Sequence, residues 1–136
     1  MKAYIVDSAA VRSNLENLKQ RAGSVPIWAV LKGDGYGLGL LPMANLCRDA
    51  GITRFAVTEV REARALREGG FKTEQILMLR PTADTDELYQ LMDLKVILTV
   101  SSQDDASILN AIAAQRSMVA EAHIKIDTGM GRYGFL

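Results

Sequence analysis

The feature that most constrains the fold is the alternation of short apolar runs with segments of helical periodicity. The run Ile27–Leu31 is apolar at every position, which is typical of a strand buried on both faces of a parallel sheet. Later runs of the same kind are separated by segments with helical spacing, capping residues and short joins. The pattern therefore predicts consecutive strand–helix units with right-handed connections.

We expect five strands, with an N-terminal helix before them and four helices between them. The expected strands are 27–32, 54–58, 75–79, 95–100 and 120–127. The expected helices are 8–22, 41–50 and 59–68, one from a cap at 84 or 85 to 92, and one from a cap at 101 or 102 to about 115. The alternation alone fits either an open doubly wound sheet or most of a TIM barrel. In both folds the functional site lies at the carboxyl ends of the strands.

Composition and charge exclude several classes of protein. Apolar residues make up 49% of the chain and charged residues 24%, which is typical of a soluble globular domain. Sixteen basic and sixteen acidic residues balance without a run of like charge, so neither a nucleic acid nor a membrane is an expected partner. Residues 1–8 lack the apolar core of a signal peptide, and Cys47 is the only cysteine. No disulfide framework is therefore expected, and the cytoplasm is the expected location.

Three other features are expected to be structural. Cys47 lies at the apolar spacing of a helix and is expected in the core. His123 is the only histidine, and a single histidine is more often packed than catalytic. The charges of 59–68 are expected on a solvated helix face.

The segment Ala29–Gly39 is the first candidate for chemistry. Lys32 ends an apolar strand, where desolvation disfavours the ammonium form and leaves an amine that can attack a carbonyl. The glycines of 33–39 allow close approach of backbone to a ligand, and Tyr36 adds a hydroxyl. The alternative is a strand-end lysine that extends to water before a flexible loop. The glycine spacing matches neither a dinucleotide-binding fingerprint nor a Walker phosphate loop.

The segment His123–Phe135 is the second candidate. His123, Lys125 and Asp127 alternate along a strand and therefore share a face. Arg132 follows in a glycine-rich loop, and its planar guanidinium suits an anionic ligand. The alternative is an exposed edge strand with a solvated face. Residues 127–129 also form the Asp-Thr-Gly triplet of aspartic proteases, but those enzymes are nearly all strand, so the expected helices argue against them.

The two segments together resemble the alanine racemase family. Val-Leu-Lys-Gly-Asp-Gly-Tyr-Gly-Leu-Gly at 30–39 is similar to that family's cofactor-lysine signature, usually Lys-Ala-Asp/Asn-Ala-Tyr-Gly-His-Gly. His-Ile-Lys-Ile-Asp-Thr-Gly-Met-Gly-Arg at 123–132 is similar to its second signature, and the order and separation also fit. The chain departs from the usual form at Gly33, Gly35 and Leu38, which affects loop packing and substrate preference.

The resemblance implies a TIM-barrel type α/β fold, with about five parallel strands of an incomplete (β/α)8 barrel. Residues 1–136 would form the N-terminal part of the pyridoxal-phosphate-binding barrel. The rest of the barrel and a C-terminal β-domain would lie outside them, because family members are more than twice as long. The full enzyme would be a homodimer in which the partner subunit supplies a second catalytic tyrosine.

The resemblance also implies roles for individual residues. Lys32 would carry pyridoxal 5'-phosphate as a Schiff base and act as a catalytic base. Arg132 would bond the phenolic oxygen of the cofactor and help to bind the substrate carboxylate. The cofactor-binding residues it implies are Lys32, Tyr36, Val30, Leu79 and Arg132. Lys125 would be carbamylated and orient Arg132, and we expect it to be buried beside that arginine, with Asp127 as an alternative anion.

The implied activity is interconversion of L-alanine and D-alanine, which supplies D-alanine for peptidoglycan. A racemase of another amino acid, such as serine, is a variant of this prediction. A non-catalytic half-barrel that binds a cofactor or a partner is the alternative. We expect the 136 residues alone to be inactive, because the acid/base group for the opposite face of the substrate is not among them.

Overall fold

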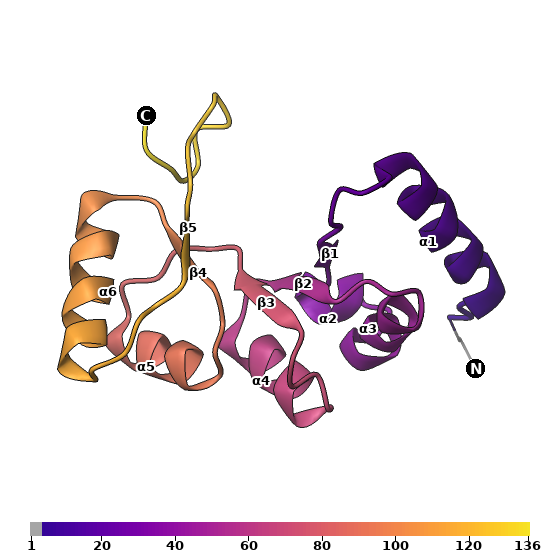
Figure 1. Cartoon of the computed structure of the whole chain (residues 1–136), viewed down its shortest axis with the longest axis horizontal. Helices are drawn as coiled ribbons and strands as arrows, with labels where there is room; N and C mark the ends of the chain where they lie inside the picture. Colours follow the sequence, from indigo (N-terminus) through magenta and orange to yellow (C-terminus); the bar gives the residue numbers. More distant parts are fainter. Residues whose placement is uncertain (1–3) are drawn as a thin grey trace.

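The five expected strands are present, and all of them are parallel. The computed structural model describes residues 4–136. Residues 1–3 of the segment 1–8, in which no signal peptide is expected, lie outside the described residues. The strands are β1 (Ala29–Val30), β2 (Arg54–Val57), β3 (Gln75–Met78), β4 (Leu98–Val100) and β5 (Ala122–Ile124). They lie side by side in chain order, as Figure 1 shows.

The register joins the strands into one curved layer. Val30 pairs with Ala56, which pairs with Leu77. An isolated bridge joins Leu77 to Ile97, so β4 follows β3 directly. A doubly wound sheet would reverse its strand order at a switch point, and no reversal occurs within 4–136. The barrel-type fold is therefore confirmed, with β1 and β5 at the two edges.

The helices begin and end close to the expected residues. They are α1 (Ser8–Ala22), α2 (Lys32–Tyr36), α3 (Leu40–Asp49), α4 (Val60–Glu68), α5 (Thr85–Asp93) and α6 (Gln103–Gln115). Three N-caps act through side-chain oxygens: Asp7 accepts from Ala9, Asp84 from Glu87 at 2.9 Å, and Ser102 from Asp105 at 3.1 Å. α2 was not expected, because its residues had been assigned to a loop.

The main core lies between the strands and the helices α3 to α6, on one face of the sheet (Figure 1). Phe55 and Phe71 are fully buried and meet edge to face, with ring centres 5.3 Å apart. Burial of such a side chain contributes roughly 1.5–3 kcal/mol. Cys47 belongs to this core as expected, and burial raises the pKa of its thiol.

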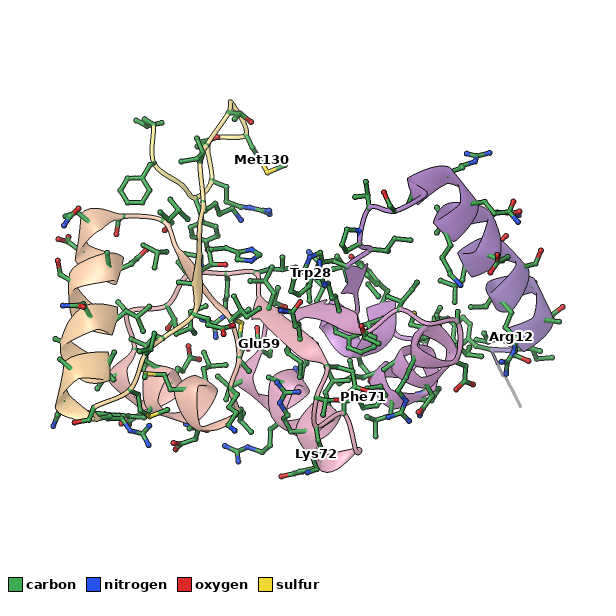
Figure 2. The ribbon with its side chains drawn as sticks, in the orientation of Figure 1. Arg12, Trp28, Glu59, Phe71, Lys72 and Met130 are labelled. Atoms are coloured by element: carbon green, nitrogen blue, oxygen red, sulfur yellow. The ribbon has the colours of Figure 1, made fainter. Side chains whose placement is uncertain are left out.

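The opposite face of the sheet is the inner face of the incomplete barrel. Trp28 lies on the other side of the strands from Phe71, as Figure 2 shows. The inner cluster comprises Trp28, Ala56, Leu77, Leu79 and Ile97. The Trp28 ring also meets the edge of His123 from β5, with ring centres 5.8 Å apart. Side chains from the two ends of the sheet therefore meet on the inner face, although β1 and β5 are not paired.

The strands are shorter than expected. β1 includes neither Ile27 nor Lys32, because its ladder with β2 covers only two residue pairs. Hydrogen bonds continue slightly further, since Leu31 N–H donates to Ala56 O at 2.8 Å and Lys125 N–H donates to Val100 O at 2.8 Å. Over residues 4–136, no helix is both long enough and apolar enough to cross a bilayer.

Candidate functional site

Lys32 lies at the carboxyl end of β1, at the start of a left-handed turn. Five consecutive residues have positive φ: Gly33 at 62°, Asp34 at 55°, Gly35 at 63°, Tyr36 at 57° and Gly37 at 82°. This conformation is costly for residues with a Cβ, and glycine adopts it freely. The glycines thus permit an ordered turn rather than a soft loop. We call residues 32–37 the lysine turn.

The lysine turn is held by hydrogen bonds at both ends. Gly35 N–H donates to Leu31 O at 2.8 Å, which closes the turn on the end of β1. Asp34 Oδ1 accepts the N–H of Leu40 at 2.7 Å and so satisfies the first turn of α3. Asp34 N–H in turn donates to Glu62 Oε1 at 3.2 Å. The turn is therefore bonded to α3 through the carboxylate of Asp34 and to α4 through the backbone N–H of Asp34.

Glu62 is buried, so the expectation of a solvated face over 59–68 is wrong at this residue. Only 5% of the surface of Glu62 is exposed to solvent. Oε2 accepts the N–H groups of Thr58 at 3.1 Å and Glu59 at 3.2 Å, in a capping box at the start of α4. The spacing Glu-x-x-Glu before an amphipathic helix was a signal that could have identified this cap.

Lys32 has a half-buried side chain that is not committed to an ion pair. No carboxylate in the described part of the chain lies within 4 Å of its amine. Tyr36 is 64% exposed, so its hydroxyl is open to a ligand or to solvent. Val30 precedes the lysine by two residues on the inner face and is also partly exposed. Among the described residues, the carboxyl end of β1 thus carries an amine without a carboxylate partner and an exposed phenol.

Lys125 lies against the end of β3. Its amine donates to the carbonyl of Leu79 in a long contact of 3.5 Å, and it lies 5.8 Å from the centre of the Tyr133 ring. Its residue is half-buried rather than buried. The predicted residues Leu79 and Lys125 are therefore neighbours on the inner face.

The segment that carries Arg132 is a closed loop beyond β5. Asp127 N–H donates to Phe135 O at 2.8 Å, and Phe135 N–H donates to Lys125 O at 2.9 Å, so residues 127–135 return on themselves. We call these residues the arginine loop. Met130 lies at its outer part, away from the helices (Figure 2). Arg132 is exposed.

Asp127 organises the arginine loop from within. Its carboxylate accepts the N–H groups of Gly129 at 2.9 Å and Gly131 at 2.9 and 3.1 Å. These backbone donors hold the pKa of Asp127 below its usual value. Since the carboxylate is used in this way, Asp127 does not act as the alternative anion beside Lys125 and Arg132. Within residues 4–136, Arg132 forms no salt bridge, and the contacts of the Lys125 amine are with Leu79 and Tyr133 rather than with Arg132.

Arg80 is a further residue of this end of the sheet that sequence reasoning missed. Its Nε donates to Thr58 O at 2.7 Å, and its guanidinium bonds Glu87 at 2.7 Å. The hydrogen bond to Glu87 raises the pKa of Arg80, and the same bond lowers the pKa of Glu87. Arg80 thereby joins the carboxyl ends of β2 and β3 to α5. Its only sequence signal was its position directly after a strand.

The fold and the site define an incomplete parallel (β/α) barrel with a strand-end lysine in a left-handed turn and an arginine loop at the same end. Residues 6–136 match the family model described as alanine racemase, N-terminal domain. The chain belongs to this family.

Individual relatives support the same assignment. The chain is 37% identical over 131 residues to the alanine racemase of Desulforamulus reducens, which covers 96% of this chain and 35% of that protein. The solved alanine racemase of Clostridium difficile 630 has a TM-score of 0.86 and 34% identity, covering 93% of this chain and 33% of that one. The histidine racemase of Leuconostoc mesenteroides also has a TM-score of 0.86, at 29% identity, covering 95% and 34%. The chain spans about a third of the length of these relatives.

Proposed function

We propose that this chain is the N-terminal part of a pyridoxal-phosphate-dependent racemase that interconverts L-alanine and D-alanine. The observation that carries the proposal is Lys32, a half-buried lysine without an ion-pair partner in residues 4–136, held by an ordered turn at the carboxyl end of β1. Family membership and the two relatives named alanine racemase support the same function.

The chemistry of the available groups fits pyridoxal phosphate. The cofactor offers an aldehyde, a phenolic oxygen and a phosphate, and this end of the sheet offers an amine, a guanidinium and an exposed phenol. Lys32 would hold the cofactor through its amine, and Arg132 would bond the phenolic oxygen. Tyr36 would lie at the phosphate, while Val30 and Leu79 would line the pocket. When bound, the cofactor withdraws electrons from the α-carbon of the substrate.

The protein residues supply orientation and proton transfer. Lys32 Nζ would move the α-proton on one face of the substrate, as a positioned general acid/base. Arg132 would bind the substrate carboxylate. Lys125 lies beside Leu79 and would orient Arg132 as an anionic carbamate, because a cationic lysine beside an arginine would repel it.

We propose that residues 1–136 are one part of the barrel and that further sequence supplies the rest. Racemisation needs a second proton-transfer group on the opposite face of the substrate. In the full enzyme this group would come from the partner subunit of a homodimer, next to a C-terminal β-domain. A cytoplasmic location fits a buried, unpaired cysteine.

The substrate side chain is the part of the proposal that this segment constrains least. The similarity to a histidine racemase over the same region is a specific observation that favours a second candidate, a racemase of another amino acid. Comparing the rates with alanine, serine and histidine in the full polypeptide separates these candidates. A clear preference for alanine supports the first.

The direct test is to identify the lysine that carries the cofactor. We expect reduction of the cofactor-loaded polypeptide with borohydride to label Lys32, as found by peptide mapping. Lys32→Ala should lower racemisation by at least 10²-fold, the lower end of what a positioned acid/base group contributes. Lys72→Ala is the control, since Lys72 is exposed and lies on the opposite side of the strands from Trp28 (Figure 2). A label on any other lysine contradicts the assignment.

A further inference from the structure

Glu62 is a buried carboxylate whose three hydrogen bonds reach two separate parts of the fold. Oε2 accepts from Thr58 and Glu59, at the junction of β2 and α4. Oε1 accepts from Asp34, 28 residues earlier, in the middle of the lysine turn. Among residues 4–136 no cation forms a salt bridge with Glu62, so its charge is stabilised by backbone N–H groups.

We infer that Glu62 is a positioning residue. It fixes the backbone of the lysine turn, which begins at Lys32, without contacting the amine of Lys32. The inference rests on the proposed function of Lys32. The left-handed conformation at Asp34 is unfavourable for a residue with a Cβ, so it needs support from its surroundings. Glu62 supplies that support from β2 and α4, which are anchored in the main core. The orientation of Lys32, which begins the lysine turn, therefore depends on a side chain of another unit.

The chemistry of the carboxylate explains why glutamate is needed here. Both oxygens face N–H donors, so both must accept. In Glu62→Gln, one of the two carboxylate oxygens is replaced by an NH₂ group. That group is a donor and would face another N–H donor, so no hydrogen bond could form there. The carbonyl of glutamine is expected to turn toward Thr58 and Glu59, because that side has two donors. The bond to Asp34 would then be lost, while the cap of α4 remains.

The chain offers a matched control in α6. Asp105 occupies the same third helical position as Glu62, and its carboxylate accepts from Ser101 N–H at 2.9 Å and from the Ser101 hydroxyl at 2.7 Å. It makes no bond to the lysine turn. Asp105→Asn therefore perturbs an equivalent cap and should leave the lysine turn unchanged.

The experiment compares wild type, Glu62→Gln and Asp105→Asn in the full polypeptide, with two readouts. The first is amide hydrogen exchange over residues 33–37 in the cofactor-free protein. The second is the rate at which pyridoxal phosphate couples to Lys32, followed by absorbance and confirmed by peptide mapping. We expect Glu62→Gln to speed exchange and slow coupling by about tenfold each, the effect of one lost hydrogen bond to a charged group. Asp105→Asn should change neither.

The outcomes separate the inference from the proposed function. If Glu62→Gln matches Asp105→Asn in both readouts, the inference is overturned. Faster exchange with unchanged coupling also overturns it, because a loosened turn would then have no consequence for the lysine. If wild type never couples at Lys32, the proposed function fails. The exchange comparison would still show whether Glu62 holds the turn.

Discussion

At the scale of single residues, Asp127 makes the arginine loop sensitive to acid. Its folded-state pKa lies below its usual value, so the loop is stabilised above the unfolded pKa of about 3.9 and loses this support as the pH falls through the folded pKa. We expect the amide signals of Gly129 and Gly131 to shift as the pH is lowered below about 3.9, where the Asp127 carboxylate becomes protonated. Asp127→Asn should remove this pH dependence, and an unchanged titration in that variant would contradict the assignment.

Gly134 closes the arginine loop, and no other residue fits its position. A Cβ there would lie 2.5 Å from Asp127 N and 2.8 Å from Ile126 C, and its φ of 128° favours glycine. Gly134→Ala should therefore break the hydrogen bonds of Phe135 with Lys125 and Asp127 that close the loop, and cost about 2 kcal/mol or more. Gly131→Ala is the control, because it meets nothing within 4 Å and should cost only about 1 kcal/mol. Chemical denaturation of both variants in the full polypeptide measures the difference.

The sequence allowed Lys32, Lys125 and Arg132 to be selected because each follows or lies on a recognisable strand. It did not reveal Glu62 or Arg80, whose roles depend on backbone groups of other units. Glu62 reaches an N–H group 28 residues away, and Arg80 reaches a carbonyl 22 residues away. Periodicity describes one element at a time and therefore carries no information about such contacts.

At the scale of elements, Arg67 joins the loops at the amino ends of the strands. Its guanidinium donates to four carbonyls, those of Leu94 at 2.7 Å, Phe71 at 2.6 Å, Glu74 at 2.9 Å and Lys95 at 2.9 Å. A lysine has only three donors on one nitrogen and cannot span them. Arg67→Lys should lower the free energy of unfolding by about 3 kcal/mol, measured by urea denaturation of the full polypeptide.

Arg64→Lys is the control on the same helix. Arg64 makes a single exposed bond to Gln90 at 2.7 Å, so its replacement should change stability by less than about 0.5 kcal/mol. Equal losses in the two variants would show that the four carbonyl bonds of Arg67 do not stabilise the fold.

The expected helices were predicted well because their ends carry local signals. Asp84 and Ser102 cap their helices as the sequence indicated, and Asp7 caps α1 in the same way. The strands were predicted too long, because apolar character continues past the point where a neighbouring strand is available for pairing. The turn α2 could not be predicted, since its left-handed backbone depends on Glu62 and α3 as well as on its glycines.

At the scale of the whole molecule, the two open edges predict that residues 1–136 alone do not racemise alanine. The unpaired backbone of β1 and β5 favours association with other strands. Ile124 on β5 is 70% exposed, and Val30 beside the lysine is 38% exposed, so water reaches both faces near the site. We expect turnover far below about 1 per second and association that increases with concentration. Assays of D-alanine formation and sedimentation test this, and ordinary turnover would contradict it.

The strand order has a consequence for how the molecule is made. Because β1 to β5 lie side by side in chain order, each unit emerging from the ribosome meets an edge that earlier residues have already formed. Each strand pairs with the strand that precedes it in the sequence, and only the closure of a complete barrel would pair the first strand with the last. The lysine turn would then be complete once α4 is synthesised, because Glu62 is the last residue that it needs. In the longer polypeptide proposed above, Lys32 would thus be set in place while the later units are still being translated.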